Sequence, residues 1–395
     1  MRRGIARNRT SAVLCIGVVG ALAAACSSSK VDGSAHSSAH DTPPAQSIQG
    51  MLGLVPNNAG VTKNPVTVNL YAVGAKVAGL SMPAAKANQA TVTRFYTLLY
   101  SKNGMPGSDL SQQLAMYAPD STKQLGLDPH DVGADVSAGG QPDIYLAARG
   151  QFDRAAVDRA VHADKTWSTK LRTPTYDKTT VYSWLDDNRI DMNQVHTGLF
   201  TDLGGSRRVA LPDDSSFVYG RNDPTVHAGL DATTRTGESL TGNQDFSAAA
   251  KLLDEKHAYS AILTATPPSV DEVAHEGIPG SGAAPSQEIL AQLKAEALGP
   301  YRLAGIGVTS GKQQPTLVIV LVSADAAAAK VNVGKLRAMI QRGTSVRTQQ
   351  PWSQVLDLQN VEAAGRLTVA MATEKASPNL WSQLFQASDT LLMHE

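Results

Sequence analysis

The stretch "RRVALPDDSSFVYG", residues 207–220, is the strongest indication of fold in this 395-residue chain. Two runs rich in apolar and aromatic residues, 207–211 and 216–219, flank residues 212–215. Pro-Asp-Asp-Ser at 212–215 is typical of a tight turn. The stretch therefore predicts a β-hairpin.

Before this hairpin the sequence predicts a strand, a helix and a further strand, and after it a second helix. Residues 143–149, "DIYLAAR", predict a strand, and residues 179–185, "TTVYSWL", predict another. Between them, Asp153 predicts the cap of a helix that runs to about residue 163, with Phe152, Ala156 and Ala160 facing inward. After the hairpin, Asp223 as cap and Pro224 at the first helical position predict a helix start.

The last hundred residues repeat this order. Residues 315–323, "PTLVIVLVS", form the most apolar predicted strand, and a helix follows over 325–342. Two strands are expected at 354–359 and 366–372. Ser377 and Pro378 then predict the start of a final helix. Its apolar stripe comprises Leu380, Trp381, Leu384, Phe385 and Leu391.

The repeated order predicts two β-α-β-β-α units, around 143–232 and 315–393. Such units favour an α+β fold, with mixed or antiparallel sheets backed by helices on one face. Further helices are expected at 88–101, 109–117, 243–255 and 287–298, and further strands at 65–73 and 259–265. The predicted organisation is a first α+β region over 51–266, a flexible loop over 267–285 and a second α+β region over 286–395.

The first 25 residues predict a secretory signal peptide. Four arginines precede an apolar run of about 15 residues, which is too short to span a bilayer. Residues 22–26, "LAAAC", resemble the bacterial lipobox, with the leucine one position earlier than is usual. Cys26 is therefore the expected lipid-attachment residue, and two or more acyl chains there would anchor the protein to a membrane.

Residues 26–50 predict a disordered tether between this anchor and the folded body. The segment is rich in serine, alanine, histidine and proline. His36 and His40 are interpreted as bystanders, because a flexible polar segment does not hold metal ligands in place.

Residues 125–160, "LGLDPHDVGADVSAGGQPDIYLAARGQFDRAAVDRA", and the hairpin at 207–220 resemble uncharacterised actinobacterial, mycobacterial-type cell-envelope lipoproteins of unknown function. In that family a similar start precedes a strand that ends in Arg-Gly-x-Phe and an alanine-rich helix. The resemblance implies export and lipidation. It supplies no catalytic residue.

The composition of the chain limits the classes of partner that the protein is expected to bind. Lysine plus arginine (35) equals aspartate plus glutamate (35), and the basic cluster lies in the signal peptide. Nucleic acid is therefore not an expected partner, because phosphate binding needs clustered cations. The expected partners are the membrane, through the lipid anchor, and a lipid or an envelope protein.

Three clusters of polar residues are candidate metal sites. Asp128, His130 and Asp131 could bind a metal, but a helix cap beside Pro129 explains them better. A second cluster, Glu272, His275 and Glu276, falls in the predicted flexible loop, which holds ligands poorly. A third cluster comprises Asp186, Asp187 and Asp191, for which a solvated turn is preferred to a calcium site.

No catalytic motif, cofactor motif or metal motif is found in the sequence. Most of the four tryptophans are expected to be buried or half-buried. The leading hypothesis is a non-enzymatic lipoprotein on the extracytoplasmic face of the cell membrane that binds an apolar or amphiphilic ligand, or an envelope protein. The alternatives are an envelope hydrolase with dispersed catalytic residues, and a structural or sensory ectodomain. The sequence assigns no ligand-binding residue.

Overall fold

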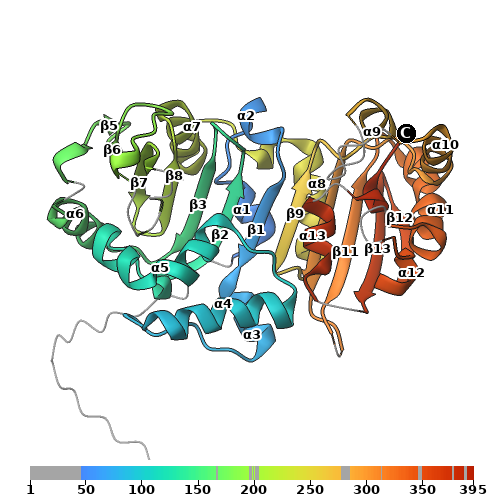
Figure 1. Cartoon of the computed structure of the whole chain (residues 1–395), viewed down its shortest axis with the longest axis horizontal. Helices are drawn as coiled ribbons and strands as arrows, with labels where there is room; N and C mark the ends of the chain where they lie inside the picture. Colours follow the sequence, from blue (N-terminus) through green and yellow to red (C-terminus); the bar gives the residue numbers. More distant parts are fainter. Residues whose placement is uncertain are drawn as a thin grey trace, which may run out of the picture. The chain divides into compact units, whose positions relative to one another are not determined.

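One antiparallel sheet organises the part of the chain that the computed structural model describes, namely residues 46–165, 168–194, 198, 200, 204–276, 285–312, 314–345, 349–375, 378–386 and 389–395. Within these residues the sheet has 13 strands in the order β12-β13-β11-β10-β9-β1-β2-β3-β8-β7-β6-β4, and β5 pairs with β6. The predicted α+β class, with antiparallel sheet and helices, is confirmed (Figure 1).

The strands of this sheet are β1 (Val66–Leu70), β2 (Val132–Ala138), β3 (Tyr145–Gly150), β4 (Leu171–Arg172), β5 (Thr175–Tyr176), β6 (Thr179–Trp184), β7 (Arg207–Asp213), β8 (Ser216–Gly220), β9 (Ser260–Thr264), β10 (Leu303–Thr309), β11 (Thr316–Val322), β12 (Leu356–Ala364) and β13 (Leu367–Glu374). The predicted hairpin is present as β7 and β8, with Asp213 paired to Ser216.

The helices are α1 (Ile48–Leu52), α2 (Ala59–Thr62), α3 (Tyr71–Ala78), α4 (Gln89–Asn103), α5 (Asp109–Leu125), α6 (Arg154–Ala163), α7 (Asp223–Thr234), α8 (Gln244–Glu255), α9 (Val270–Glu276), α10 (Gln287–Glu296), α11 (Ala326–Arg342), α12 (Trp352–Val355) and α13 (Leu380–Gln386). Short 3₁₀ turns include η1 (Pro129–Asp131) and η6 (Thr390–Leu392).

The connectivity on one side of the central β1–β9 pair resembles that on the other. From β1 the chain continues through β2 and β3, crosses through α6, and returns from the edge so that β8 lies beside β3. From β9 it continues through β10 and β11, crosses through α11, and returns so that β13 lies beside β11. The two predicted units therefore form the two ends of a single sheet, and the first unit has three further strands, β4, β5 and β6.

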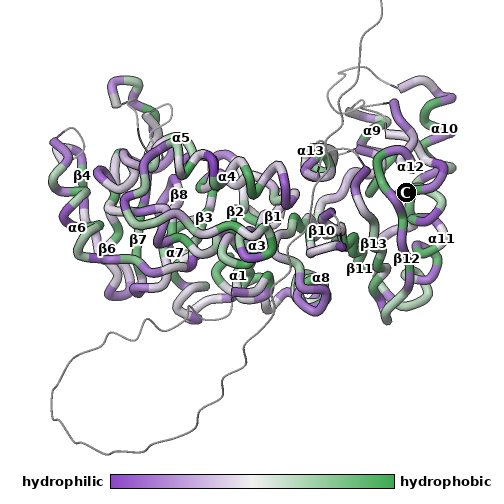
Figure 2. The backbone as a smooth tube through the Cα atoms, turned by 90° about the horizontal axis from the view of Figure 1, so that it is seen from below, coloured by the Kyte–Doolittle hydropathy of each residue, from purple (hydrophilic) through white to green (hydrophobic). Residues whose placement is uncertain are grey.

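Helices cover both faces of the sheet, not one face as expected. The first face carries α3 to α6 and α11 to α13, and the second carries α1, α7 and α8. Figure 2 shows α4, α5 and α13 on one side of the central strands and α1, α7 and α8 on the other. Strand β11 explains why: Leu317, Ile319 and Leu321 face the first layer, while Val318 and Val320 face the second. An unbroken apolar strand must be buried on both faces.

Local hydrogen bonds correct two predicted boundaries. Strand β1 ends at Leu70 and helix α3 begins at Tyr71, so the strand expected at 65–73 is too long. The cap of α7 is Asn222, whose side chain accepts a hydrogen bond from the Thr225 amide at 2.8 Å. Asp223 is the first helical residue and Pro224 the second.

Two expected unstructured segments contain helices. Helix α1 begins at Ile48, so the folded body begins before the end of the tether predicted over residues 26–50. Helix α9 occupies part of the loop expected at 267–285. The final helix, α13, is shorter than expected, and Leu391 lies beyond it in η6. Ser377 and the Leu384 side chain lie outside the described residues.

Candidate functional site

The expected lipid-attachment residue, Cys26, lies outside the described residues, as do His36, His40 and Trp167. The other three tryptophans, Trp184, Trp352 and Trp381, are buried as predicted.

The Asp128 cluster is a cap, as preferred from the sequence. One Asp128 carboxylate oxygen accepts from the His130 amide at 2.9 Å, and the other accepts from the Lys86 amide at 2.7 Å. The His130 Nδ1 atom lies 2.8 Å from the Pro83 carbonyl oxygen. Burial, followed by the nearby Asp128 charge, raises the pKa of Asp131 to about 6. These contacts hold the turn before β2.

The second cluster belongs to α9. Ser269 and Glu272 cap the helix reciprocally: the Ser269 amide donates to Glu272 at 2.9 Å, and the Glu272 amide donates to Ser269 at 3.1 Å. The His275 Nδ1 atom lies 2.7 Å from the Asp271 carbonyl oxygen. Among the described residues, no group of three or more histidine, cysteine, aspartate or glutamate side chains is placed to hold a metal ion.

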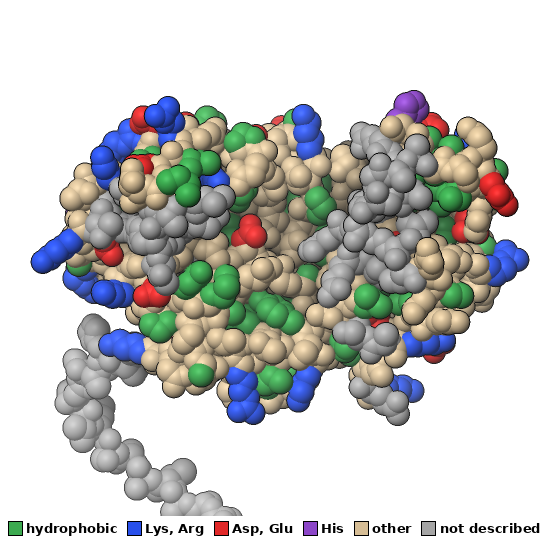
Figure 3. Space-filling view, viewed as in Figure 1, with side chains coloured by type: hydrophobic (Ala, Val, Ile, Leu, Met, Phe, Trp, Pro, Cys, Tyr) green, Lys and Arg blue, Asp and Glu red, His purple; other side chains and the backbone are tan. Residues whose placement is uncertain are grey.

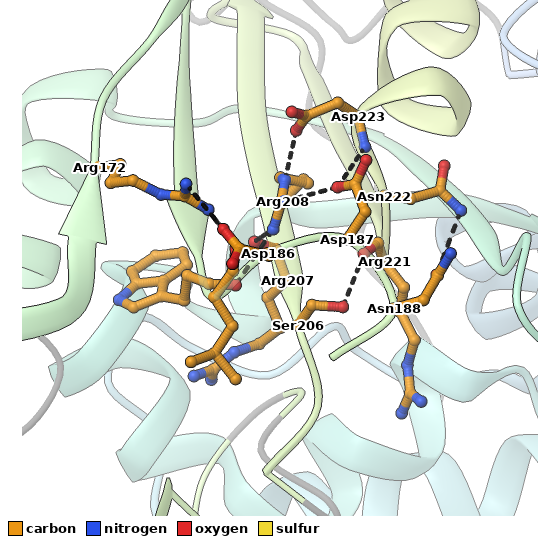
Figure 4. A network of polar contacts seen from close by, with 12 residues as sticks. Arg172, Asp186, Asp187, Asn188, Ser206, Arg207, Arg208, Arg221, Asn222 and Asp223 are labelled. Carbon is orange, nitrogen blue, oxygen red and sulfur yellow. Dashed lines mark hydrogen bonds and ion pairs between the residues drawn. The ribbon is translucent and has the colours of Figure 1, made fainter. Parts of the chain in front are cut away.

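The third cluster lies in an exposed turn, as preferred from the sequence, where Asp186 and Asp187 pair with arginines and Asp191 accepts from the Asn193 amide at 3.0 Å. Asp186 pairs with Arg172 at 3.1 Å, and Asp187 pairs with Arg208 at 2.6 Å. Arg208 is 1 % exposed and also pairs with Asp223. Its Nη1 group donates to the Trp184 main-chain carbonyl oxygen at 3.1 Å. Figure 4 shows Arg208 between Asp187 and Asp223. The network fastens the segment after β6 to the start of α7, which is a structural role.

A buried polar cluster lies between the sheet and helices α3 to α5. Asp135 on β2 is fully buried and accepts from the hydroxyl of Ser108, the N-cap of α5. The Ser108 hydroxyl also lies 3.0 Å from the Tyr71 hydroxyl. Tyr96 stacks edge-on against Tyr71, with ring centroids 5.4 Å apart. Burial raises the pKa of Asp135 to about 7.

This cluster is sealed from solvent. Asn69, Ser111 and Ser260 complete its surroundings and are themselves fully buried. The Ser260 hydroxyl donates to the side-chain amide oxygen of Asn69 at 2.6 Å. Its chemistry could suit proton transfer, but no substrate atom can reach Asp135 in this arrangement. We interpret the cluster as part of the core.

A pocket of about 250 Å³ is the best candidate site. It lies on the first face of the sheet, between strands β9 and β10 and the carboxy-terminal segment 378–395. Its lining residues come from four separate parts of the chain: Lys63, Pro65, Thr264, Thr266, Pro268, Ile306, Phe385, Asp389, Leu391 and Leu392.

The pocket has an apolar interior and a polar rim. Ile306, Leu391 and Leu392 are buried and present hydrocarbon to the cavity. Lys63 and Thr266 are exposed at the opening, and the Thr266 hydroxyl donates to the Lys63 carbonyl at 3.1 Å. This arrangement suits a ligand that has an apolar part and a polar end.

The unequal insertions in the two halves explain why a pocket forms here. Between β1 and β2 the chain inserts α3, α4 and α5, which pack on the first face of the sheet. In the described residues of the equivalent insertion, between β9 and β10, the helices are α9 and α10. These two helices pack against Met393 in a small core of their own. The carboxy-terminal segment therefore covers the first face above β9 and β10, and it does so incompletely.

Sequence reasoning missed this site because it missed β10. Gly305 and Gly307 are unusual in a strand. A Cβ atom on Gly307 would lie 2.5 Å from a methyl carbon of Leu253, so the glycine allows α8 to approach the sheet closely. The signal that could have revealed the strand is the alternation of Ala304, Ile306 and Val308 on the opposite face.

Charge on the face seen in Figure 3 is dispersed. Lysine and arginine side chains lie mainly around its margin. The residues that line the pocket include two charged side chains, Lys63 and Asp389. No helix in the described part of the chain is both long and apolar enough to cross a membrane.

No family model matches the chain, and no curated protein matches it. Among solved structures, crystal form III of TP0453 is 8% identical, with a TM-score of 0.39 over 85% of this chain and 97% of that chain. Crystal form I of TP0453 is 10% identical, with a TM-score of 0.38 over 86% of this chain and 97% of that chain. The function must therefore be argued from the pocket.

Proposed function

We propose that this protein is a lipoprotein, anchored through Cys26 on the extracytoplasmic face of the cell membrane, that binds an apolar or amphiphilic ligand without catalysing its conversion. The observation that carries the proposal is the pocket beneath the carboxy-terminal segment, with its apolar interior and its opening beside Lys63.

The size of the pocket limits what enters it. An apolar cavity of about 150 Å³ accepts a benzene molecule. Drug-sized ligands usually occupy about 300 to 1,000 Å³. At about 250 Å³, the pocket has room for a ring or a short acyl segment. A longer amphiphile would leave its remaining atoms at the rim or in solvent.

The proposed location supplies such ligands. A signal peptide, a lipobox-like cysteine and a polar tether would hold the folded body close to a bilayer. The resemblance of residues 125–160 to envelope lipoproteins supports the same location. A protein tethered there meets amphiphiles at a high local concentration.

The test is to identify what co-purifies with the protein. Full-length protein from envelope extracts would be analysed by mass spectrometry beside the variants Thr266→Trp and Thr97→Trp. Thr266 is an exposed rim residue, so an indole there blocks the opening with little effect on the core. Thr97 is exposed on α4 and does not line the pocket, so it is the matched control.

We expect an amphiphile with the wild type and with Thr97→Trp, and at least about tenfold less with Thr266→Trp. Recovery of equal amounts from all three proteins, or of no amphiphile from any, would contradict a ligand-binding function for this pocket.

A further inference from the structure

Two charged side chains line the pocket, and they are placed differently. Lys63 is exposed at the rim, whereas Asp389 is 4% exposed. A ligand with a charged end therefore meets a cation at the opening and a carboxylate farther in. This difference bears on which charge the ligand carries and on which end enters first.

The carboxylate of Asp389 holds the carboxy-terminal segment in place through hydrogen bonds. One of its carboxylate oxygens accepts from the Ser345 hydroxyl at 2.6 Å, and the other accepts from the Thr390 amide at 2.7 Å. The Thr390 hydroxyl continues the contact by donating to the Thr344 carbonyl at 2.8 Å. A buried carboxylate that is hydrogen-bonded in this way repels a second anion in the interior of the pocket.

Lys63 is held by its main chain and not by its side chain. Its amide donates to the Val61 carbonyl as the C-cap of α2, and its carbonyl accepts from Thr266. The ion pairs of the described residues do not include its ammonium group. The ammonium group can therefore turn toward a ligand at the rim without breaking an existing ion pair.

We propose that the ligand is an anionic single-chain amphiphile, bound with its apolar end among Ile306, Leu391 and Leu392 and its anionic headgroup at Lys63. This inference rests on the proposed function and adds the charge and the orientation of the ligand. The carboxylate of Asp389 excludes the reverse orientation, because the anionic head would then lie in the interior beside it.

The experiment compares three probes that share one tail: decanoate, decan-1-ol and decylamine. Binding is measured by titration calorimetry below the micellar concentration. The protein is the full-length chain carrying Cys26→Ala, which removes the proposed acylation site so that no attached acyl chain competes. We expect decanoate to bind about fivefold more tightly than decan-1-ol, the upper range for one exposed ion pair. Higher salt should reduce this preference.

Variants then assign the preference to Lys63. We expect Lys63→Gln to bind decanoate and decan-1-ol equally, and Lys63→Arg to keep the preference. The matched control is Lys76→Gln, since Lys76 is an exposed lysine on α3 that does not line the pocket. It should behave as the wild type. Lys63 is exposed, so none of these changes should lower the melting temperature.

Each outcome has a distinct meaning. Equal binding of all three probes, tightest binding of decylamine, or a decanoate preference that survives Lys63→Gln would overturn the anionic class while leaving the proposed function in place. If none of the three probes binds, both the inference and the proposed function fail.

Discussion

The indole N–H of Trp381 donates a hydrogen bond to the main-chain carbonyl of Gly104 at 3.0 Å, across 277 positions of the sequence. The Trp381 amide also donates to the Glu374 carboxyl group at 2.7 Å. These contacts fasten α13 to the end of α4 and to the end of β13. Because the segment that follows α13 forms a wall of the pocket, the same contacts hold that wall in place.

Trp381→Ala should destabilise the protein by about 3–5 kcal/mol, because it removes a fully buried aromatic ring and its hydrogen bond. The measurement is the free energy of unfolding in denaturant. Trp381→Phe, which keeps an aromatic ring but loses the indole N–H, should cost less. If Trp381→Ala melts as the wild type does, and a soluble quencher reaches the wild-type indole, then α13 is a detachable helix and not part of the fold.

Gly104→Ala should be more harmful than Gly79→Ala. Both glycines end a helix with φ of 65°, so alanine costs about 1–2 kcal/mol at either position. A Cβ atom on Gly104 would also lie 2.0 Å from the Pro378 carbonyl oxygen, whereas one on Gly79 has no atom within 4 Å. The two melting temperatures give the comparison. Equal losses would show that the Gly104–Pro378 contact is unimportant.

Arg208→Met should cost on the order of 3 kcal/mol, because it removes a buried guanidinium that pairs with Asp187 and Asp223. Arg172→Met is the matched control. It breaks an exposed pair with Asp186 and should cost less than about 1 kcal/mol. Chemical denaturation of both variants distinguishes them. Similar small losses would mean that the network is not a structural clamp.

Stability should fall as the pH rises from about 4 to about 8. Burial raises the pKa of Asp135 to about 7 and that of Glu374 to about 8, above unfolded values near 4. In this window the folded state therefore binds more protons than the unfolded state, so raising the pH favours unfolding. Asp213, whose pKa is lowered, acts in the opposite direction only below about pH 4.

Asp135→Asn should reduce this pH dependence and leave the part that Glu374 contributes, because an amide resembles the protonated carboxyl group. The measurement is the free energy of unfolding at pH 5 and pH 8. Glu362→Gln, at an exposed position on β12, is the control and should keep the wild-type difference. A wild type that is more stable at pH 8 than at pH 5 would refute the expected protonation of Asp135.

Cys26→Ala should release the protein from membranes or leave an unprocessed precursor, because the variant lacks the thiol that takes the lipid. Cell fractionation and labelling with radioactive palmitate check this. Cys15→Ala is the control, since Cys15 lies in the predicted signal peptide and its loss should leave both results unchanged. Equal palmitate incorporation into Cys26→Ala and the wild type would refute the anchor.

The helix caps and the hairpin could be predicted because their contacts are local. Asp153 accepts from the Ala156 amide at 2.9 Å, and Asp325 accepts from the Ala328 amide at 2.9 Å. Each such bond joins residues three positions apart, so the residue types alone indicate it. The turn between β7 and β8 is local in the same sense.

The sequence by itself determined the α+β class and most helix starts, since each depends on short-range patterns. Only the tertiary structure decided that both ends belong to one sheet, that Asp135 is buried, and that a pocket lies above β9 and β10. Lys63 and Asp389 line one cavity although 326 positions separate them, because β1 pairs with β9 and the carboxy-terminal segment folds back over that pair. Contacts of this kind depend on the order of strands in the sheet, which no short stretch of the chain specifies.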